Sequence, residues 1–230
     1  LDQLNRMEYR PLEGFVFTVS PFNFTAIASN LNMAVALMGN TTVWKPASTA
    51  LLSNYHLLRL LMEAGLPPGV VNFVPGEGAV IGDAALSHPM LAGIHFTGSN
   101  ATFNRLWQTV GTNLKTYRSY PRLVGETGGK DFIFAHASAD PQALATAIVR
   151  GGFEYQGQKC SAASRAYVPA SLWPTVRDAA LDMIGRIKVG DVRDLGNFVN
   201  AVIDEASFDN IMRYVGRARD SSDARILVGG

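Results

Sequence analysis

Residues 14–45 read GFVFTVSPFNFTAIASNLNMAVALMGNTTVWK, and this stretch decides the fold class. Its first seven residues, 14–20, are rich in β-branched and aromatic side chains and predict a buried strand that a proline ends. Residues 26–38 have a helical composition and stop at Gly39-Asn40, a pair typical of helix C-termini. Residues 41–45 predict a second strand. A strand, a helix and a strand in this order form the repeating unit of a parallel sheet.

The same alternation continues along the chain. Capping residues, apolar spacing and prolines predict these further elements: a helix capped by Ser48 or Thr49, a strand at 70–74, a helix at 80–86, a strand at 91–96, a helix opened by Thr97-Gly98-Ser99, and then strand 131–134, helix 141–153, strand 165–168, helix 172–187, helix 207–219 and a last strand at 225–228. The expected fold is therefore α/β, with a doubly wound parallel sheet whose ligands bind outside the carboxyl ends of the strands.

Composition restricts the classes of function. The chain has 230 residues, of which 47% are hydrophobic, so it is long enough to bury a core in one or two domains. Its net charge of +1 leaves no broad basic surface for nucleic acid or an anionic membrane, which favours a small-molecule ligand. No apolar run reaches the roughly 18 residues that span a bilayer. The four histidines show no ligand spacing, and a single cysteine makes a metal site improbable.

Two residues are the first candidates for chemistry. Cys160 is the only cysteine, and it lies in a polar, glycine-containing loop beside Lys159, a cation that would favour the thiolate. Glu126 directly precedes a Thr-Gly-Gly turn and could act as a carboxylate base. A lone cysteine is more often an inert buried group, so the thiol alone does not establish catalysis.

Three other features could bind a ligand at the sheet edge. Thr97-Gly98-Ser99 places backbone N–H groups and a hydroxyl at a helix start, which suits a pyrophosphate but is also an ordinary cap. Lys45, at the end of a strand, could bind ribose hydroxyls or a phosphate, or could simply be solvated. Asn23 could donate its amide to a developing oxyanion, although asparagine beside proline is usually a turn residue.

The order of these motifs resembles the aldehyde dehydrogenase superfamily. The resemblance runs from about Leu12 to Gly230, and it rests on the motifs Pro21-Phe22-Asn23-Phe24, Trp44-Lys45-Pro46-Ala47, the run from Gly65 to Asn72 that reads GLPPGVVN, Phe96-Thr97-Gly98-Ser99, Glu126-Thr127-Gly128-Gly129-Lys130 and Gly157-Gln158-Lys159-Cys160. Within the superfamily, Tyr120-Pro121-Arg122-Leu123, Phe153-Glu154-Tyr155 and Ser171-Leu172-Trp173-Pro174 are similar to the Δ1-pyrroline-5-carboxylate dehydrogenases. That subfamily oxidises glutamate γ-semialdehyde to glutamate in proline catabolism.

The resemblance implies a role for each candidate. Cys160 would be the nucleophile, Asn23 an oxyanion donor and Glu126 the base that activates water. Lys159 and Ser161 would contact the carboxylate of the substrate. NAD would bind at Ser20, Lys45, Ser48, Gly98, Ser99, Asn100, Ala101 and Thr102. Residues 1–126 would form the dinucleotide-binding domain, and residues 127–230 part of the catalytic domain, with Thr127-Gly128-Gly129 at the boundary.

Several departures from the family pattern bear on these expectations. Asn32 stands where many members have a lysine, Phe103 where they have a glycine, and Ser48 where strongly NAD-selective members often have a glutamate. NAD is therefore expected, with NADP as the alternative. The later stretches of the family are missing, and the chain lacks an initial methionine. We therefore expect a fragment of a homo-oligomeric protein that is inactive alone.

Other functions remain as alternatives. They are an aldehyde dehydrogenase of different specificity, a non-catalytic dinucleotide-binding module and a cysteine hydrolase. A binding module needs none of Asn23, Glu126 and Cys160, and a hydrolase lacks a histidine close in sequence to the cysteine. By resemblance, a eukaryotic source would imply the mitochondrial matrix and a bacterial source the cytoplasm.

Overall fold

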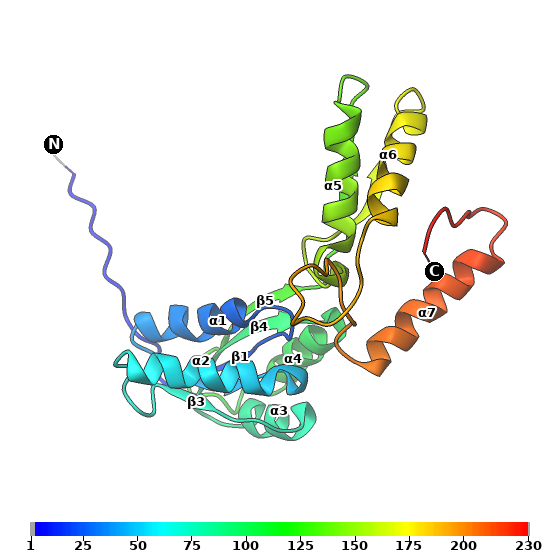
Figure 1. Cartoon of the computed structure of the whole chain (residues 1–230). Coiled ribbons are helices and arrows are strands. Elements are labelled where there is room, and N and C mark those ends of the chain that lie inside the picture. The colour runs from blue at the N-terminus through cyan, green and yellow to red at the C-terminus, as the bar shows by residue number, and fades with distance from the viewer. Residues whose placement is uncertain (1–2, 230) are drawn as a thin grey trace. The chain divides into compact units, whose positions relative to one another are not determined.

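The computed structural model describes residues 3–229 and divides the chain into two compact units (Figure 1). The first unit ends at Gly128 and the second begins at Gly129. Each is an α/β structure built on parallel strands. Among the described residues, no helix is both long and apolar enough to cross a membrane.

The first unit contains the predicted doubly wound parallel sheet. Its strands lie in the order β3-β2-β1-β4-β5, and every neighbouring pair is parallel. The strands are β1 (Phe15–Val19), β2 (Thr41–Lys45), β3 (Val71–Phe73), β4 (Leu91–Gly98) and β5 (Arg122–Thr127). The chain builds outward from β1 to β3 and then crosses to the other side of β1, so the order reverses between β1 and β4.

Helices cover both faces of this sheet because its strands are apolar on both sides. Helices α1 (Thr25–Leu37) and α2 (Leu51–Glu63) pack together on one face, and α3 (Gly78–Leu86) and α4 (Asn100–Thr112) pack together on the other. The first face buries Trp44 with Ala28, and the second buries Phe17 with Leu86 and Phe96. A sheet covered on both faces is typical of parallel architecture.

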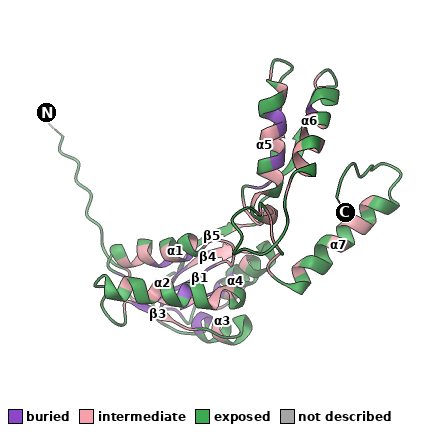
Figure 2. Cartoon of the chain, in the orientation of Figure 1, coloured by how far each residue is buried: buried purple, intermediate pink, exposed green. Residues whose placement is uncertain are grey.

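The second unit has a smaller sheet, in which β6 (Asp131–Phe134) pairs in parallel with β7 (Ala163–Tyr167). Helices α5 (Pro141–Phe153) and α6 (Trp173–Gly185) lie side by side, and their apolar residues centre on Ala145 and Val176 (Figures 1 and 2). The 3-10 turn η2 (Glu154–Gly157) follows α5. Helix α7 (Glu205–Asp220) is amphipathic, but none of its residues is buried.

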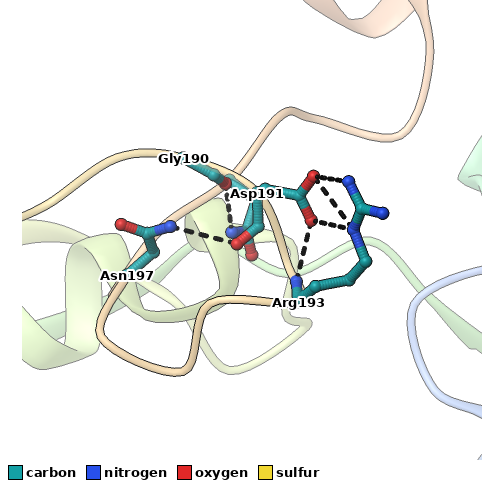
Figure 3. Close-up of polar contacts among 5 residues, drawn as sticks. Gly190, Asp191, Arg193 and Asn197 are labelled. Carbon is teal, nitrogen blue, oxygen red and sulfur yellow. Dashed lines mark hydrogen bonds and ion pairs between the residues drawn. The ribbon is translucent and has the colours of Figure 1, made fainter.

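Side-chain hydrogen bonds order the segment between α6 and α7, which has little regular structure (Figure 3). The carboxylate of Asp191 accepts bonds from the backbone N–H and the guanidinium of Arg193, at 2.8 Å and 2.6 Å. These bonds lower the pKa of Asp191. Asn197 donates to the carbonyl of Asp191, and Asn200 to the carbonyl of Gly190.

Three sequence predictions about elements need correction. Ser48 and Thr49 do not cap α2, because they lie in the 3-10 turn η1 (Ser48–Ala50) and the N-cap residue of α2 is Ala50, which makes no side-chain capping bond. Strand β5 was not predicted, and Glu126 lies within it, before the glycine turn. Residues 225–228 form no strand, since no segment of residues 3–229 pairs with them.

An aromatic ring covers the strand that carries Glu126. Gly125 pairs with Phe96 across β4 and β5, and a Cβ at Gly125 would lie only 2.3 Å from Cζ of Phe103. The Phe103 ring stacks on Phe96 with centroids 5.4 Å apart. Phe103 of α4 therefore occupies the space that any side chain at position 125 would need.

We predict that Gly125→Ala lowers the free energy of unfolding by about 1–3 kcal/mol, because the new methyl group overpacks against Phe103. Combining it with Phe103→Ala should cost clearly less than the sum of the two single changes. Gly111→Ala is the control. Gly111 lies in α4, the helix of Phe103, and a Cβ there would meet nothing within 4 Å. Urea unfolding measures all four variants, and strictly additive costs would contradict this packing.

Candidate active site

Most of the predicted site residues of the first unit lie at the carboxyl edge of its sheet. Val19 at the end of β1 is level with Lys45 of β2 and with Phe96 of β4, and Thr97 is level with Glu126 of β5. Because parallel strands end at the same edge, the residues that follow them gather there. The reversal of strand order between β1 and β4 makes this edge the expected ligand crevice of a doubly wound sheet.

The loop after β1 carries Ser20 and Asn23. Ser20 is 3% exposed, and its Oγ accepts a hydrogen bond of 2.8 Å from Nε1 of Trp44. The Ser20 hydroxyl therefore keeps one proton to donate. Asn23 is half-buried between β1 and α1. Their shared loop places both side chains at the carboxyl edge.

A buried polar cluster surrounds Asn32, the position at which members of the resembled family often have a lysine. Its Oδ1 accepts bonds from the hydroxyls of Thr18 at 2.6 Å and Thr42 at 3.0 Å, and its Nδ2 donates to the carbonyl of Ala28. All three side chains of this cluster are almost fully buried. A lysine would place an ammonium between two hydroxyl groups with no carboxylate among these partners, so Asn32 serves the packing of α1 on the sheet.

The start of α4 can bind an anion. Ser99 caps the helix as predicted, with its Oγ accepting from the N–H of Thr102 at 3.2 Å. The first turn contains no acidic residue, and the N–H groups of Asn100 and Ala101 belong to it. A helix N-terminus carries a partial positive charge, which suits phosphate oxygens.

Lys45 adds a positive charge to the same edge. Its side chain is half-buried and passes close to the start of α3, where a Cβ on Gly78 would lie 3.9 Å from Nζ. Burial lowers the pKa of Lys45. The ammonium has no hydrogen bond or ion pair with any of the described residues, so an anionic ligand would offset its desolvation. Ser48 lies nearby in η1 and is exposed.

The loop that carries Cys160 belongs to the second unit and has an unusual backbone. Tyr155, Gln156 and Gly157 have φ angles of 55°, 57° and 67°, a left-handed run that includes two residues other than glycine. Such conformations persist only where surrounding contacts impose them, and they concentrate at functional sites. Cys160 follows this run and is half-buried.

Gly129 lies directly against the backbone of Cys160. A Cβ at Gly129 would lie 2.0 Å from the carbonyl oxygen of Cys160, and the φ angle of Gly129 is +142°. Only glycine can therefore occupy this position without displacing the Cys160 peptide. Contact with Gly129 thus fixes the backbone on which the thiol is carried.

Lys159 is already partnered. Its Nζ lies 2.7 Å from Oε2 of Glu154, whose Oε1 lies 2.6 Å from Nη2 of Arg150. The hydrogen bonds and charges of these two cations lower the pKa of Glu154 to about 2. The sequence prediction gave Glu154 no role, although its spacing of four residues from Arg150, one residue beyond the predicted helix 141–153, was a signal. Ser161 is exposed in the same loop.

The structure thus gathers the predicted residues into two sets. The edge set, in the first unit, consists of Ser20, Asn23, Lys45, Ser48, Gly98, Ser99, Asn100, Ala101, Thr102 and Glu126. The loop set, in the second unit, consists of Lys159, Cys160 and Ser161. Over residues 3–229, no group of three or more His, Cys, Asp and Glu side chains is placed to hold a metal ion. The two sets offer an anion-binding edge, a carboxylate and a thiol.

Comparisons with known proteins identify relatives of this chain. Two curated relatives are named Δ1-pyrroline-5-carboxylate dehydrogenase, mitochondrial: that of Dictyostelium discoideum is 51% identical over 228 residues and that of Homo sapiens 52% over 227. Each alignment covers 98% of this chain, but only 41% and 40% of the relative. The chain therefore spans about two-fifths of the length of these relatives.

A solved structure gives the same result. The Δ1-pyrroline-5-carboxylate dehydrogenase of Mycobacterium tuberculosis bound with NAD matches with a TM-score of 0.94 and 54% identity, over 96% of this chain and 42% of that one. The profile described as the aldehyde dehydrogenase family matches residues 2–230. The chain belongs to the aldehyde dehydrogenase family.

Proposed function

We propose that the full-length protein oxidises glutamate γ-semialdehyde to glutamate with NAD, as a step in proline catabolism. The main support is that relatives and a solved structure named as pyrroline-5-carboxylate dehydrogenases are 51–54% identical to this chain over nearly its whole length. The edge set and the loop set contain the residue types that the reaction needs. An aldehyde dehydrogenase of other specificity is the alternative within the family.

The residues of this chain would supply the covalent chemistry. The thiolate of Cys160 attacks the aldehyde carbon, and the Asn23 amide and the Cys160 N–H donate to the oxyanion that forms. Removal of one such donor typically slows a reaction about 10²- to 10³-fold. Bound NAD supplies the acceptor for the hydride. Glu126 then takes a proton from the water that hydrolyses the Cys160 thioester, which releases glutamate and restores the thiol.

The edge set fits an anionic dinucleotide. The α4 N-terminus with Gly98, Ser99, Asn100, Ala101 and Thr102 would hold the pyrophosphate, and Lys45 with Ser20 would hold the ribose or phosphate oxygens. We propose NAD as the main cofactor because the similar structure from Mycobacterium tuberculosis is bound with NAD. Ser48 has no carboxylate to repel a 2′-phosphate, so we propose NADP as a weaker cofactor.

The setting of the enzyme follows from the same proposal. We propose that the full-length protein forms a homo-oligomer, in the mitochondrial matrix if the source is eukaryotic and in the cytoplasm if it is bacterial. The relatives from Dictyostelium discoideum and Homo sapiens carry the word mitochondrial in their names. Lys159 and Ser161 are proposed to contact the substrate's carboxylate.

We expect the full-length protein to reduce NAD with glutamate γ-semialdehyde at a higher kcat/KM than with simple aliphatic aldehydes, because only the semialdehyde carries an α-carboxylate for the site to bind. Cys160→Ala should remove this activity, because no other thiol in these residues can form the thioester. NADH absorbance measures both. Preference for an aliphatic aldehyde would overturn the substrate, and full activity of Cys160→Ala would overturn the nucleophile.

Gly129→Ala tests whether the Cys160 backbone must stay where Gly129 holds it. The new Cβ would collide with the Cys160 carbonyl, so the N–H that donates to the oxyanion would move, and we expect kcat to fall about 10²-fold or more. Gly216→Ala is the matched control, since its Cβ would meet nothing within 4 Å. Steady-state NADH formation and circular dichroism check activity and folding. Unchanged kcat in a folded Gly129→Ala protein would contradict the prediction.

A further inference from the structure

Glu154 holds two cations at the base of the Cys160 loop. One carboxylate oxygen binds Arg150, one turn earlier in the chain, and the other binds Lys159, the residue before the cysteine. The Lys159 side chain is 24% exposed, whereas that of Arg150 is 61% exposed. The ion pair with Lys159 is therefore the less solvated of the two, and loss of its carboxylate would leave a partly buried ammonium without a counter-charge.

The same ion pair closes the left-handed run. Glu154 and Lys159 lie at its two ends, with Tyr155, Gln156 and Gly157 between them. Gln158 adds a second tie, because its N–H donates to the carbonyl of Tyr155 and its Oε1 accepts from the N–H of Ile203 at 2.9 Å. A backbone in such sparsely populated conformations needs contacts that impose it, and the Glu154–Lys159 pair spans the whole segment.

The pair also decides where the charge of Lys159 acts. A lysine next to a cysteine can stabilise the thiolate, but here the ammonium is bound to a carboxylate that stays ionised at neutral pH. The two charges largely offset one another. Neutralising Glu154 would leave the ammonium of Lys159, the residue next to Cys160 in the chain, without its counter-charge.

We propose that Glu154 is a positioning residue for the nucleophile: it closes the left-handed loop that presents Cys160 and keeps the Lys159 charge from the thiol. This deepens the proposed function, because it assumes that Cys160 is the nucleophile. Glu154 acts through Lys159 and the loop backbone, and it need not touch the substrate.

The test compares two readouts in the full-length protein. Glu154→Gln should raise the rate at which iodoacetamide alkylates Cys160 by about threefold or more at neutral pH, since the Lys159 charge then favours the thiolate. The same change should lower kcat for aldehyde oxidation about tenfold, because the loop loses its tie. Mass spectrometry of the peptide that contains Cys160 reports alkylation at this residue alone.

Further variants test whether the Lys159 charge causes the faster alkylation. Glu154→Asp keeps the charge and should stay near the wild-type alkylation rate, as should Arg150→Gln, which leaves the Lys159 pair intact. Glu154→Gln combined with Lys159→Met should lose the increase. Glu63→Gln, which breaks an exposed pair with Arg59 in α2, is the matched control for neutralising a glutamate.

The outcomes are distinguishable. A fall in both alkylation and kcat would mean a merely structural role and would overturn the proposal, as would no change in either. An increase that survives Lys159→Met would also overturn it. If Glu154→Gln does not fold, Lys159→Met alone tests the same pair and must not raise alkylation. Alkylation needs no aldehyde oxidation, so a wrong substrate in the proposed function and a failure of this inference give different results.

Discussion

The parallel pairing of β1 with β2 on one side and β4 on the other is the constraint on which the first unit depends. The pairing places β1 at the centre of the sheet, where Phe17 and Thr18 are almost fully buried. Strands β2 and β3 are added on one side of β1, and β4 and β5 on the other. Loops after neighbouring parallel strands must then open at one edge. This pairing accounts for the positions of Asn23, Lys45 and Ser99. The position of Glu126 also depends on the pairing of β5 with β4.

Close contacts at glycines lie next to two of the candidate chemical groups. In the first unit, Phe103 lies on Gly125, the residue before Glu126; in the second, Gly129 lies on the Cys160 peptide. Both contacts need glycine, so the glycines near the two candidate groups have a packing role as well as a conformational one. The departure of Phe103 from the family's glycine is matched by the absence of a side chain at position 125.

Much of the fold could be predicted from local signals. Strand 41–45 and helix 141–153 have the predicted bounds, because β-branched runs, a proline at the helix start and a capping aspartate act locally. Strand β5 has weak local signals, since Val124 and Glu126 are exposed and Gly125 has no side chain, and it exists because β4 offers an edge to pair with. Residues 225–228 show the converse, an apolar run without a pairing edge.

The candidate site also has residues that the sequence could suggest and contacts that it could not. Cys160, Glu126 and Asn23 could be proposed as site residues because the order of motifs resembles a family to which the chain belongs. The tie between Glu154 and Lys159 could not, because it depends on the left-handed backbone at Tyr155 and Gln156, where no glycine signals such a turn. Local sequence predicts elements well, but contacts across a strained loop require coordinates.

In the proposed reaction, Cys160 and Glu126 serve successive steps on one aldehyde. Rapid-mixing measurement of NADH formation by the full-length Glu126→Gln protein tests it most directly. We expect a rapid burst of about one NADH for each Cys160, followed by turnover about 10²- to 10⁴-fold slower than wild type, because the thioester forms but its hydrolysis lacks the base. Undiminished steady turnover, or loss of the burst itself in a folded protein, would contradict it.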